Sequence, residues 1–544
     1  MYQNLFQLYI MLHMKLKTIL MTAFSAVIFS LSMPNEMAIE GLPLLAFVGL
    51  APFFWALMQK ISHRWAGLLG LVFAVVTTQI QFFWLSYFQN WALFTLGGVT
   101  LGFILLYSIL AQVMRWIAGH GGPHRWVWMA VAWAVFEFFK SNGFIAFPWG
   151  LSPYPLHSWL NLVQIVDVYG LTILSFFIAG FNLWIAQRLT DFKPLGKESM
   201  GQLGALYLTT LLFLVYGAGS LSQNPEVTSK AQLVLVQKNA DPWVRSLEQV
   251  KNTLSTGVRL SSEALSKKDL PPIDLIIWSE TSLTFTFNQT SFYEKFPEEL
   301  PLNELIRRSQ THWLFGNIFY PNFPDTSIAQ NATLFVNPQA QIVDHYGKRK
   351  LVPMAEGIPF WHVDWVRDLI SGTLGLRPWT PGSKPTVFEL PLKAGGTLKF
   401  GTPICFEDAF PFVVNELVQK GSQILVNVSN DTWSKTVSAQ NQHHLLARFR
   451  AIETKRYLIR STNSGTSGMI DPWGRKVGPF IPWFTDTYTP QEIPIYKTYP
   501  LTAYVLWGDW LAYLMVVALV LKGLGCSWIG ERLRSFLSFA FYRR

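Results

Sequence analysis

Glu280, Lys348 and Cys405 are the residues whose types suit chemistry at a carbonyl group. A cysteine sulfur attacks a carbonyl carbon when a neighbouring base takes its proton. Glu280 follows an apolar run in LIIWSE, where burial should raise the pKa of its carboxyl group and suit it to act as that base. A lysine beside the sulfur would lower the pKa of the thiol or stabilise an oxyanion. If these side chains meet in space, they predict acyl transfer by a cysteine nucleophile.

Each residue also has a structural interpretation. Cys405, in GTPICFED, is expected to end a strand and to project its sulfur at the rim of a sheet, but it could instead be a small buried hydrophobe. Glu280 could be a solvated strand end. Lys348 lies with Arg349 and Lys350 in a segment that could be a solvated basic turn. None of the three signals is specific alone.

Other chemistries have less support. The chain lacks HExxH, paired CxxC and a spaced His–carboxylate set, and the adjacent His443 and His444 would point in different directions from a helix. We therefore expect no metal and no cofactor. A Ser/His/Asp mechanism lacks its G-x-S-x-G elbow, and GTSG at 465–468 lacks the strand-into-helix context of a phosphate loop.

The composition predicts a membrane protein. Half of the 544 residues are hydrophobic and 14% are charged, whereas soluble chains average about 25% charged residues. The net charge is +10, but Lys and Arg gather beside apolar runs rather than in a basic-aromatic pattern. This distribution favours topology signals, and no nucleic-acid partner is expected.

Apolar runs long enough to cross a bilayer divide the chain. Seven precede residue 222 and an eighth lies near 502–521. The seven lie near 18–34, 41–58, 65–86, 92–118, 125–139, 165–188 and 202–219. We therefore expect a membrane domain at 1–221, a catalytic domain at 222–500, and a last transmembrane helix with a cytoplasmic tail at 501–544.

Basic residues alternate with the spans so that all basic segments fall on one side, the cytoplasm. The multi-pass chain is then expected in a cytoplasmic membrane, with residues 222–500 on its outer side. The cysteines, Cys405 and Cys526, would lie on opposite sides of that membrane. A lone thiol in an oxidising compartment needs a reason, which favours a functional role for Cys405.

The region between the seventh and eighth predicted spans has the sequence pattern of an α/β sandwich. Near-continuous apolar runs suggest strands in sheets covered by helices, and 436–456 reads as a helix. The predicted strands are 231–237, 273–280, 312–320, 332–337, 398–407, 422–430 and 457–465.

Taken together, Glu280, Lys348 and Cys405 resemble the Glu-Lys-Cys triad of the nitrilase, or carbon–nitrogen hydrolase, superfamily. The resemblance narrows to the apolipoprotein N-acyltransferase family through YGKRKLVPMAEGIP, SNDTWSKTVSAQNQHHLLARFRAIETKRYLIRSTNSG and FPWGLSPYP with IVDVYGLTIL. It covers nearly the whole chain and implies an α-helical bundle of about eight transmembrane helices plus an extracytoplasmic αββα nitrilase-like sandwich.

The resemblance implies the last step of lipoprotein maturation. A phospholipid, usually phosphatidylethanolamine, would give an acyl chain to the enzyme cysteine as a thioester. The α-amine of the N-terminal diacylglyceryl-cysteine of an apolipoprotein would then accept that chain as an amide. Such a sequence of half-reactions is ping-pong, and the enzyme is expected to act as a monomer.

The same resemblance implies roles for the motif residues. Glu280 would be the base, Lys348 would stabilise the oxyanion, and Cys405 would be the nucleophile. Glu356 would orient Lys348, and Glu407 matches an acidic residue two positions after the nucleophile. Four aromatic residues are implied or proposed to contact substrate: Trp243, Phe406, Trp149 and Trp361.

The chain departs from the family pattern near the site. Met354-Ala355 stands where Phe-Gly is usual before Glu356, Phe406 stands where Tyr is frequent, and Ser434-Lys435 replaces another Phe-Gly. None of these changes removes a triad residue. They leave donor and acceptor preference more open than the reaction class.

The segment 357–382 is too apolar for an ordinary exposed loop. We expect it, with FIPWF at 480–484, to form a lid or a lipid-contacting arm, because Trp favours the membrane interface. The alternative is a small core packed on the domain. The residues of 357–382 that carry this expectation are Phe360, Trp361, Trp365, Leu369, Leu374 and Trp379.

Other functions stay open at this point. A membrane-anchored amidase would share the triad but pass the acyl group to water. A non-catalytic lipoprotein-binding module is disfavoured because every triad residue is present. A transporter would carry more charged residues inside its spans. This chain has few, and Glu137 and Asp167 lie near span ends.

Overall fold

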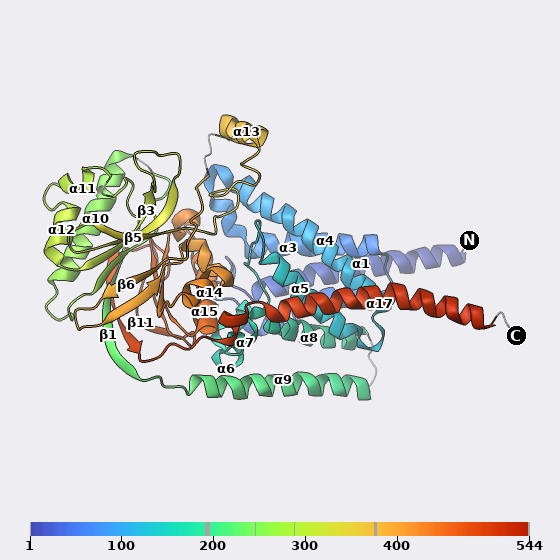
Figure 1. The fold of residues 1–544 in the computed structure, drawn as a ribbon. Coiled ribbons are helices and arrows are strands. Elements are labelled where there is room, and N and C mark those ends of the chain that lie inside the picture. The colour runs from blue at the N-terminus through green and yellow to red at the C-terminus, as the bar shows by residue number, and fades with distance from the viewer. Residues whose placement is uncertain (1, 191–195, 245, 288, 375–377, 542–544) are drawn as a thin grey trace. The chain divides into compact units, whose positions relative to one another are not determined.

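The computed structural model describes residues 2–190, 196–244, 246–287, 289–374 and 378–541 (Figure 1). The chain divides into two compact units, Met1–Val215 with Asp509–Arg544, and Tyr216–Gly508. The first unit is helical, and the second contains all the named strands of the described residues. The side chains of Cys526 and of the arginines that follow it lie outside the described part of the chain.

The helical unit is built from long apolar helices. Four are long and apolar enough to cross a membrane, at Tyr9–Leu31, Leu93–His120, Leu171–Thr190 and Ser199–Leu221. Shorter apolar helices cover Pro43–Met58, Leu160–Tyr169 and Trp510–Gly525. A membrane domain is therefore supported, while the total of eight crossings stays a prediction. The helices of this unit are α1 (Tyr2–Leu31), α2 (Ala51–Met58), α3 (His63–Gln81), α4 (Gly98–His120), α5 (Arg125–Lys140), α6 (Leu160–Val163), α7 (Val166–Tyr169), α8 (Leu171–Thr190), α9 (Lys197–Leu221, whose last residues pass into the second unit) and α17 (Trp510–Phe541).

Aromatic side chains fill the interior of the helical unit. The Phe53 and Phe73 rings stack at 4.5 Å, and Trp133 meets Phe54 edge-on at 5.4 Å. Leucines such as Leu101 and Leu105 on α4 are exposed instead. A helical unit whose interior and surface are both apolar has the pattern of helices that face lipid.

The second unit is a sandwich of two six-stranded sheets, in the orders β12-β1-β2-β3-β4-β5 and β11-β10-β9-β8-β7-β6. β1, β2 and β3 run parallel, as do β7, β8 and β9, and the outer pairs are antiparallel. The strands are β1 (Val227–Gln237), β2 (Leu275–Trp278), β3 (His312–Phe319), β4 (Gln330–Val336), β5 (Ile342–Gly347), β6 (Val387–Pro391), β7 (Thr397–Gly401), β8 (Ile424–Ser429), β9 (Tyr457–Thr462), β10 (Ser467–Ile470), β11 (Lys476–Ile481) and β12 (Thr487–Tyr496).

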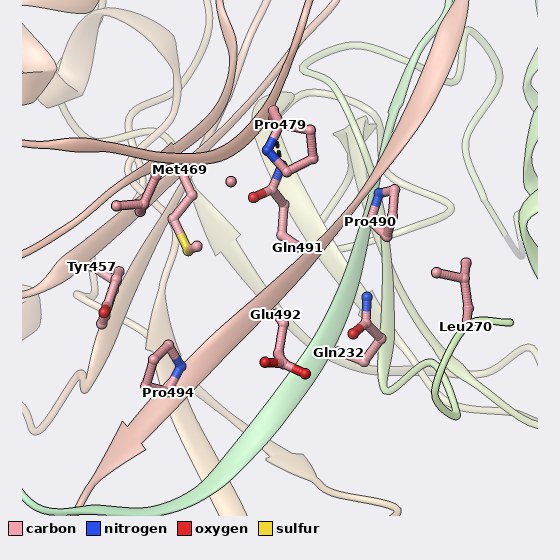
Figure 2. Close-up of a pocket in the computed structure, with 11 residues that line it drawn as sticks. Gln232, Leu270, Tyr457, Met469, Pro479, Pro490, Gln491, Glu492 and Pro494 are labelled. Atoms are coloured by element: carbon pink, nitrogen blue, oxygen red, sulfur yellow. Dashed lines mark hydrogen bonds between the residues drawn. The ribbon is translucent and has the colours of Figure 1, made fainter.

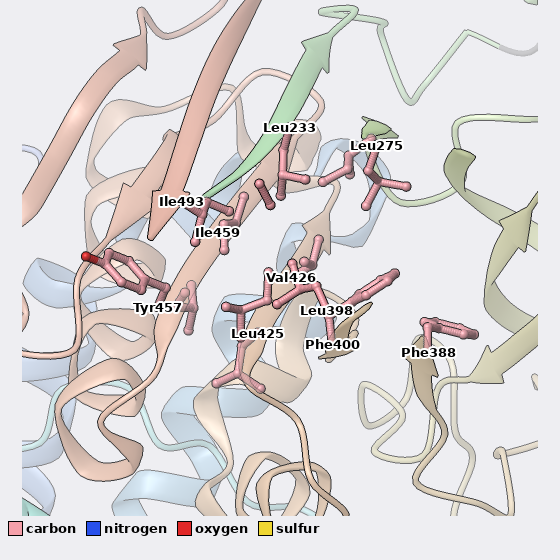
Figure 3. Packing of buried hydrophobic residues seen from close by; sticks show 14 of the residues in the cluster. Leu233, Leu275, Phe388, Leu398, Phe400, Leu425, Val426, Tyr457, Ile459 and Ile493 are labelled. Atoms are coloured by element: carbon pink, nitrogen blue, oxygen red, sulfur yellow. The ribbon is translucent and has the colours of Figure 1, made fainter. Parts of the chain in front are cut away.

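Alternation along β1 separates two cores. Leu233 and Leu235 point into the core between the sheets, while Val234 and Val236 point to the opposite face. Figure 3 shows Leu233 and Leu275 of the first sheet facing residues such as Val426 of the second. This packing is why the strands are apolar on both faces.

Helices cover both outer faces of the sandwich. Residues of α10 (Leu247–Ser266) and α12 (Leu302–Ser309) pack on the first sheet, and those of α14 (Pro411–Gln419) and α15 (Val437–Thr454) pack on the second. The architecture is αββα, so the expected fold class is confirmed. The short helices of the unit are α11 (Phe292–Lys295), α13 (Asp364–Leu374) and α16 (Ala503–Trp507).

Candidate active site

Glu280 follows the end of β2, where the two sheets come together. Its Oε2 accepts the backbone N–H of Asn430 at 2.9 Å, and its Oε1 accepts Nδ2 of Asn331 at 2.8 Å. The chain passes close to β3 here, because a Cβ added at Gly316 would lie 2.4 Å from the Cα of Glu280. Glu280 is 5% exposed, so it is a buried carboxylate held from both sheets rather than a solvated strand end.

Lys348 directly follows β5 and is buried, at 1% exposure. Its Nζ lies 3.1 Å from Glu280 and 2.9 Å from Glu356. Its backbone N–H donates to Asn331 and its carbonyl accepts the N–H of Gly382. The solvated-turn interpretation is therefore wrong. Burial alone would lower the pKa of Lys348, but the carboxylates of Glu280 and Glu356 outweigh burial and hold that pKa well above its ordinary value.

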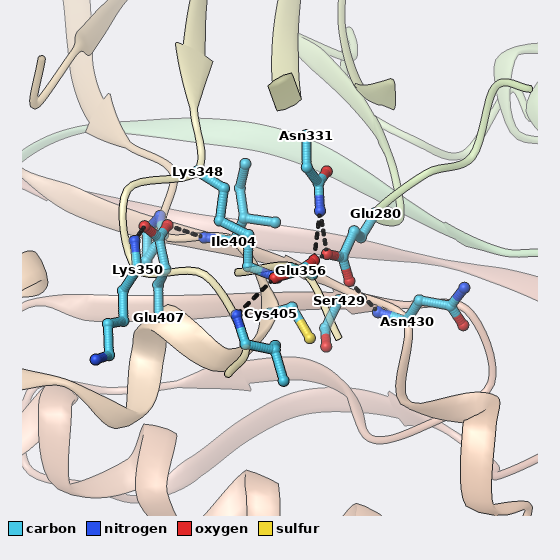
Figure 4. Close-up of polar contacts among 12 residues, drawn as sticks. Glu280, Asn331, Lys348, Lys350, Glu356, Ile404, Cys405, Glu407, Ser429 and Asn430 are labelled. Carbon is cyan, nitrogen blue, oxygen red and sulfur yellow. Dashed lines mark hydrogen bonds and ion pairs between the residues drawn. The ribbon is translucent and has the colours of Figure 1, made fainter. Parts of the chain in front are cut away.

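Asn331 links the carboxylates around Lys348. Its Nδ2 donates to Oε1 of Glu280 at 2.8 Å and to Oε1 of Glu356 at 3.1 Å. Oε2 of Glu356 accepts the backbone N–H of Val352 at 2.9 Å. Figure 4 shows these side chains converging beside Cys405. The arrangement gives two carboxylates and one ammonium fixed directions in a small buried volume.

Cys405 does not end a strand, contrary to the sequence prediction. β7 stops at Gly401, Ile404 forms an isolated bridge with Val428, and Cys405 begins a 3₁₀ turn with a φ of +49°. A non-glycine residue with positive φ is strained and marks a sharp turn of the backbone. The carbonyl of Cys405 accepts hydrogen bonds from Asn427 and His443 at 3.2 and 3.3 Å. These contacts hold the turn that aims the sulfur.

The Cys405 thiol is protonated in the resting site. Burial raises its pKa well above the ordinary value, and the negative charge of Glu280 raises it further. Lys348 acts in the opposite direction, as the sequence suggested, but its effect is the smaller one. Because burial and Glu280 outweigh the lysine, a base must take the proton during attack.

Glu407 fastens the Lys348 segment to the Cys405 turn. Its Oε1 accepts the backbone N–H groups of Arg349 and Lys350 at 2.6 and 2.9 Å. Its Oε2 accepts the N–H of Ile404 at 2.8 Å, and the Tyr346 hydroxyl donates at 2.9 Å. Burial raises the pKa of Glu407, although these N–H donors counteract it. Glu407 therefore holds backbone and does not point at the reacting sulfur in this structure.

Trp243 and Phe406, two of the aromatic residues expected to bind substrate, lie near the catalytic loops. Trp243 is half-buried, donates from Nε1 to the carbonyl of Trp433 at 3.1 Å and meets that ring edge-on. Phe406 is buried and lies 4.8 Å from the ring of Phe410. Phe406 thus adjoins Cys405 in the chain, whereas Trp243 contacts the loop that follows β8.

The other aromatic residues lie elsewhere. Trp149 belongs to the helical unit, where it is buried and stacks on Phe147 at 5.1 Å. Trp361 is half-buried, while Phe360 and Trp365 are 68% and 69% exposed. Within the expected arm, the exposed apolar surface thus belongs more to Trp365 than to Trp361. The side chain of Leu374 lies outside the described residues.

FIPWF at 480–484 is not a free arm. Phe480 and Ile481 belong to β11, and Ile481 is buried. Trp483 donates from Nε1 to the Thr466 hydroxyl at 3.0 Å. The segment is therefore packed on the domain, as the alternative interpretation proposed.

A separate pocket opens among β1 and β10–β12 (Figure 2). Its volume is about 450 Å³, and Met469, Pro479, Pro490 and Gln491 are among its lining residues. None of the candidate catalytic residues lines it, so we assign it no part in the chemistry. Across the described residues, no group of three or more His, Cys, Asp and Glu side chains is arranged to hold a metal ion.

Sequence reasoning missed several residues of the site. Asn331 directly precedes the predicted strand 332–337, and its contacts with Glu280 and Glu356 depend on the tertiary fold. Ser429 and Asp431 appeared only within a family stretch and His443 was considered only as a metal ligand, but the three form a buried polar group beside Cys405. The signal that could have found them is the density of polar residues, SNDTW, directly after an apolar strand.

The two-sheet sandwich and the clustered Cys, Lys and Glu side chains define a domain of the carbon–nitrogen hydrolase class, and residues 235–500 match the family model for carbon-nitrogen hydrolase. Residues 25–184 match the model for the apolipoprotein N-acyltransferase N-terminal domain. The chain is 32% identical to apolipoprotein N-acyltransferase 2 of Treponema pallidum (strain Nichols), over 92% of this chain and 94% of that protein.

Two further relatives agree. Apolipoprotein N-acyltransferase 2 of Treponema denticola is 34% identical, over 91% of this chain and 95% of that protein. Apolipoprotein N-acyltransferase of Borreliella burgdorferi is 30% identical, over 95% of this chain and 98% of that protein. The chain belongs to the apolipoprotein N-acyltransferase family. The resemblance drawn from its motifs is confirmed, and the protein is an enzyme of the acyltransferase class.

Proposed function

We propose that this enzyme moves an acyl chain from a phospholipid to the α-amine of the N-terminal diacylglyceryl-cysteine of an apolipoprotein, through a thioester on Cys405. The observation that carries the proposal is the buried pairing of Lys348 with Glu280 and Glu356 beside that cysteine. Family membership supports these substrates, and the proximity of a carboxylate, an ammonium and a thiol supports these roles.

In the first half-reaction, Glu280 takes the thiol proton as sulfur attacks the ester carbonyl of the phospholipid. The carbonyl oxygen becomes negative, and the Lys348 ammonium is the nearby charge that stabilises it. The C–O bond then breaks, and Glu280 returns the proton to the departing lysophospholipid alcohol. A protonated resting thiol suits this order, because deprotonation is coupled to attack.

In the second half-reaction, the acceptor amine attacks the thioester carbonyl and gives a proton to Glu280. The C–S bond breaks, the amide leaves, and the proton returns to the sulfur. Glu280 thus serves as base and acid in both steps, while Glu356 and Asn331 keep Lys348 aimed. One group can do both jobs because each step consumes and releases one proton.

Both proposed substrates are membrane lipids, so the active domain must reach them. We assign residues 1–221 to the membrane domain, 222–500 to a periplasmic catalytic domain and 501–544 to the last span and tail, in a bacterial inner membrane. The exposed Trp365 and Leu369 on α13 would contact the lipid interface. Phosphatidylethanolamine is the proposed donor, and the enzyme would work as a monomer.

A membrane-anchored hydrolase is the second candidate, because residues 235–500 match the carbon-nitrogen hydrolase model. It would use the same sulfur and base but pass the acyl group to water. Its product would be a free fatty acid or acid, with no acylated amine. A non-catalytic lipoprotein-binding module finds less support, since a buried Lys–Glu pair beside a thiol is costly to keep without chemistry.

Mass spectrometry after incubation with phosphatidylethanolamine vesicles tests the proposal. We expect one acyl mass on Cys405, which is absent in Cys405→Ala, and its loss when a diacylglyceryl-cysteine peptide is added. The peptide should gain the same mass. An unmodified Cys405 alongside acylated peptide would contradict the thioester, and fatty acid as the sole product would favour the hydrolase.

A further inference from the structure

A buried group of charged side chains lies beside the Cys405 turn, and the mechanism above does not use it. The side chains of Asp408, Asp431, His443 and Arg460 are at most 8% exposed. Arg460 bridges the two aspartates, reaching Asp408 with Nη1 and Asp431 with Nη2. Buried charges persist when they are paired and hydrogen-bonded. Two carboxylates facing a guanidinium and an imidazole meet that condition.

His443 is held as an imidazolium by its two partners. Nε2 lies 2.8 Å from Asp408 and Nδ1 lies 2.8 Å from Asp431. Because an ionised carboxylate only accepts hydrogen bonds, both ring nitrogens must carry protons. Burial lowers the pKa of His443, but the aspartates outweigh burial and raise that pKa to about 9. Burial likewise raises the pKa of Asp431, but His443 and Arg460 outweigh it and leave that pKa below its ordinary value.

Ser429 lies between the Asp431 carboxylate and the proposed nucleophile, Cys405. It ends β8, and its hydroxyl donates to Oδ1 of Asp431. Figure 4 shows Ser429 beside Cys405, and although burial raises the pKa of the Cys405 thiol, Ser429 acts to lower that pKa. A hydroxyl has one proton and two lone pairs. At rest that proton belongs to Asp431, and the oxygen can accept the S–H of Cys405.

A second route joins the group to the same residue. Nε2 of His443 lies 3.3 Å from the carbonyl oxygen of Cys405, so the imidazolium contacts the backbone of the strained turn. The sulfur is thus reached through Ser429 and the backbone through His443.

We propose that Ser429 is a positioning residue for Cys405, with its hydroxyl shared between the sulfur and the Asp431 carboxylate, which His443 and Arg460 hold in place. The inference rests on the proposed role of Cys405 as nucleophile. When Glu280 takes the thiol proton, the thiolate competes with Asp431 for the Ser429 proton. Ser429 therefore orients the sulfur in both protonation states, and Asp431 limits how far it stabilises the thiolate.

The test is alkylation of Cys405 by iodoacetamide against pH, in the full chain carrying Cys526→Ser so that one thiol remains. Ser429→Ala removes a donor to the thiolate and should slow alkylation about tenfold near neutral pH. Asp431→Asn removes an anion and frees the Ser429 proton, so it should speed alkylation by a similar factor. Ser429→Thr keeps the hydroxyl and should recover most of the rate.

The control is Ser461→Ala on β9, the register partner of Val428, whose hydroxyl donates to the Ile277 carbonyl instead. It should match the parent chain. Alkylation in guanidinium chloride gives the rate of the unfolded chain, and an Asp431→Asn rate equal to it would count against the proposal. The proposal would also fail if Ser429→Ala were alkylated as fast as Ser461→Ala. It would fail as well if Ser429→Ala and Asp431→Asn changed the alkylation rate in the same direction.

Acyl-enzyme formation from phosphatidylethanolamine vesicles separates this inference from the proposed function. If Cys405→Ala still forms the acyl-enzyme, the proposed nucleophile is wrong. If Cys405 carries the acyl group while Ser429→Ala acylates as fast as Ser461→Ala, only the role of Ser429 is wrong. A lower acylation rate for Ser429→Ala with an unchanged KM supports positioning.

Discussion

Oε1 of Glu407 accepts the backbone N–H of Arg349 at 2.6 Å, although 58 residues separate the two. The segment that carries Lys348 and the turn that carries Cys405 are thereby joined through one buried carboxylate. Ile404 donates to the other oxygen of the same group at 2.8 Å. The distance between cation and sulfur is therefore set by backbone contacts to a residue that does not itself react.

Glu407→Gln tests whether this carboxylate, as a clamp, holds the Lys348 segment and the Cys405 turn together. An amide offers one acceptor oxygen, so its NH₂ must face N–H or O–H donors that the carboxylate satisfied. Leaving such groups unpaired costs about 1–3 kcal/mol each, and we expect kcat/KM for acyl transfer to fall by about tenfold or more. Exposed Glu389→Gln on β6 is the control. Equal activity of the two variants, measured on phosphatidylethanolamine vesicles, would contradict the clamp.

Asn331→Asp should disable the site through charge. A third carboxylate would stand at the place where Nδ2 now bridges Glu280 and Glu356, and like charges at that range repel. We expect about a hundredfold slower acyl-enzyme formation near neutral pH, with partial recovery at lower pH as the added group takes a proton. Asn322→Asp on an exposed loop should leave the rate unchanged. A flat pH profile for Asn331→Asp would argue against the bridge.

His443 should make stability fall in mild alkali. Because the pKa of His443 is raised to about 9 in the folded protein, against about 6.5 in an unfolded chain, its contribution is fully present below about pH 6.5. That contribution is lost as pH rises through about 9. Asp408, Asp431 and Arg460 are the charged groups that face it.

The measurement is the free energy of unfolding of the detergent-solubilised chain against pH, for the parent and His443→Gln. The parent should lose on the order of a few kcal/mol more than the variant between about pH 6.5 and 9. Exposed His362→Gln should follow the parent. Identical slopes for parent and His443→Gln would show that the histidine is not held as a cation.

Trp365→Ala with Leu369→Ala tests the lipid contact of α13. Both side chains are more than half exposed, and an interfacial tryptophan loses its favourable setting when truncated. Turnover on vesicle-borne phospholipid should fall several-fold, while turnover of a short soluble thioester should hold. Phe323→Ala, which removes an exposed aromatic from the β3–β4 connection, is the control. Equal losses on both substrates would indicate a packing role instead.

The sequence predicted seven of the twelve named strands in the described part of the catalytic domain, because apolar runs report burial on both faces, and it missed β5, β6, β10, β11 and β12. It placed six of its seven strand regions within a few residues but extended one too far, since 398–407 ends as a strand at Gly401. The error arose because TPIC is apolar for a different reason: it packs as a turn against β8, with Ile404 bridging Val428. Hydrophobicity alone does not distinguish a strand from an apolar turn that packs against a strand.

By itself the sequence determined the membrane character, the family, the αββα class and which Glu, Lys and Cys to propose as catalytic, because these depend on composition and on motifs that are local in the chain. Only the tertiary structure decided that Lys348 is buried between Glu280 and Glu356, that the Cys405 thiol is protonated, and that Asn331, Ser429 and His443 surround it. Lys348 and Asn331 meet Glu280 from segments more than 50 residues away in the chain, and no local pattern encodes that meeting.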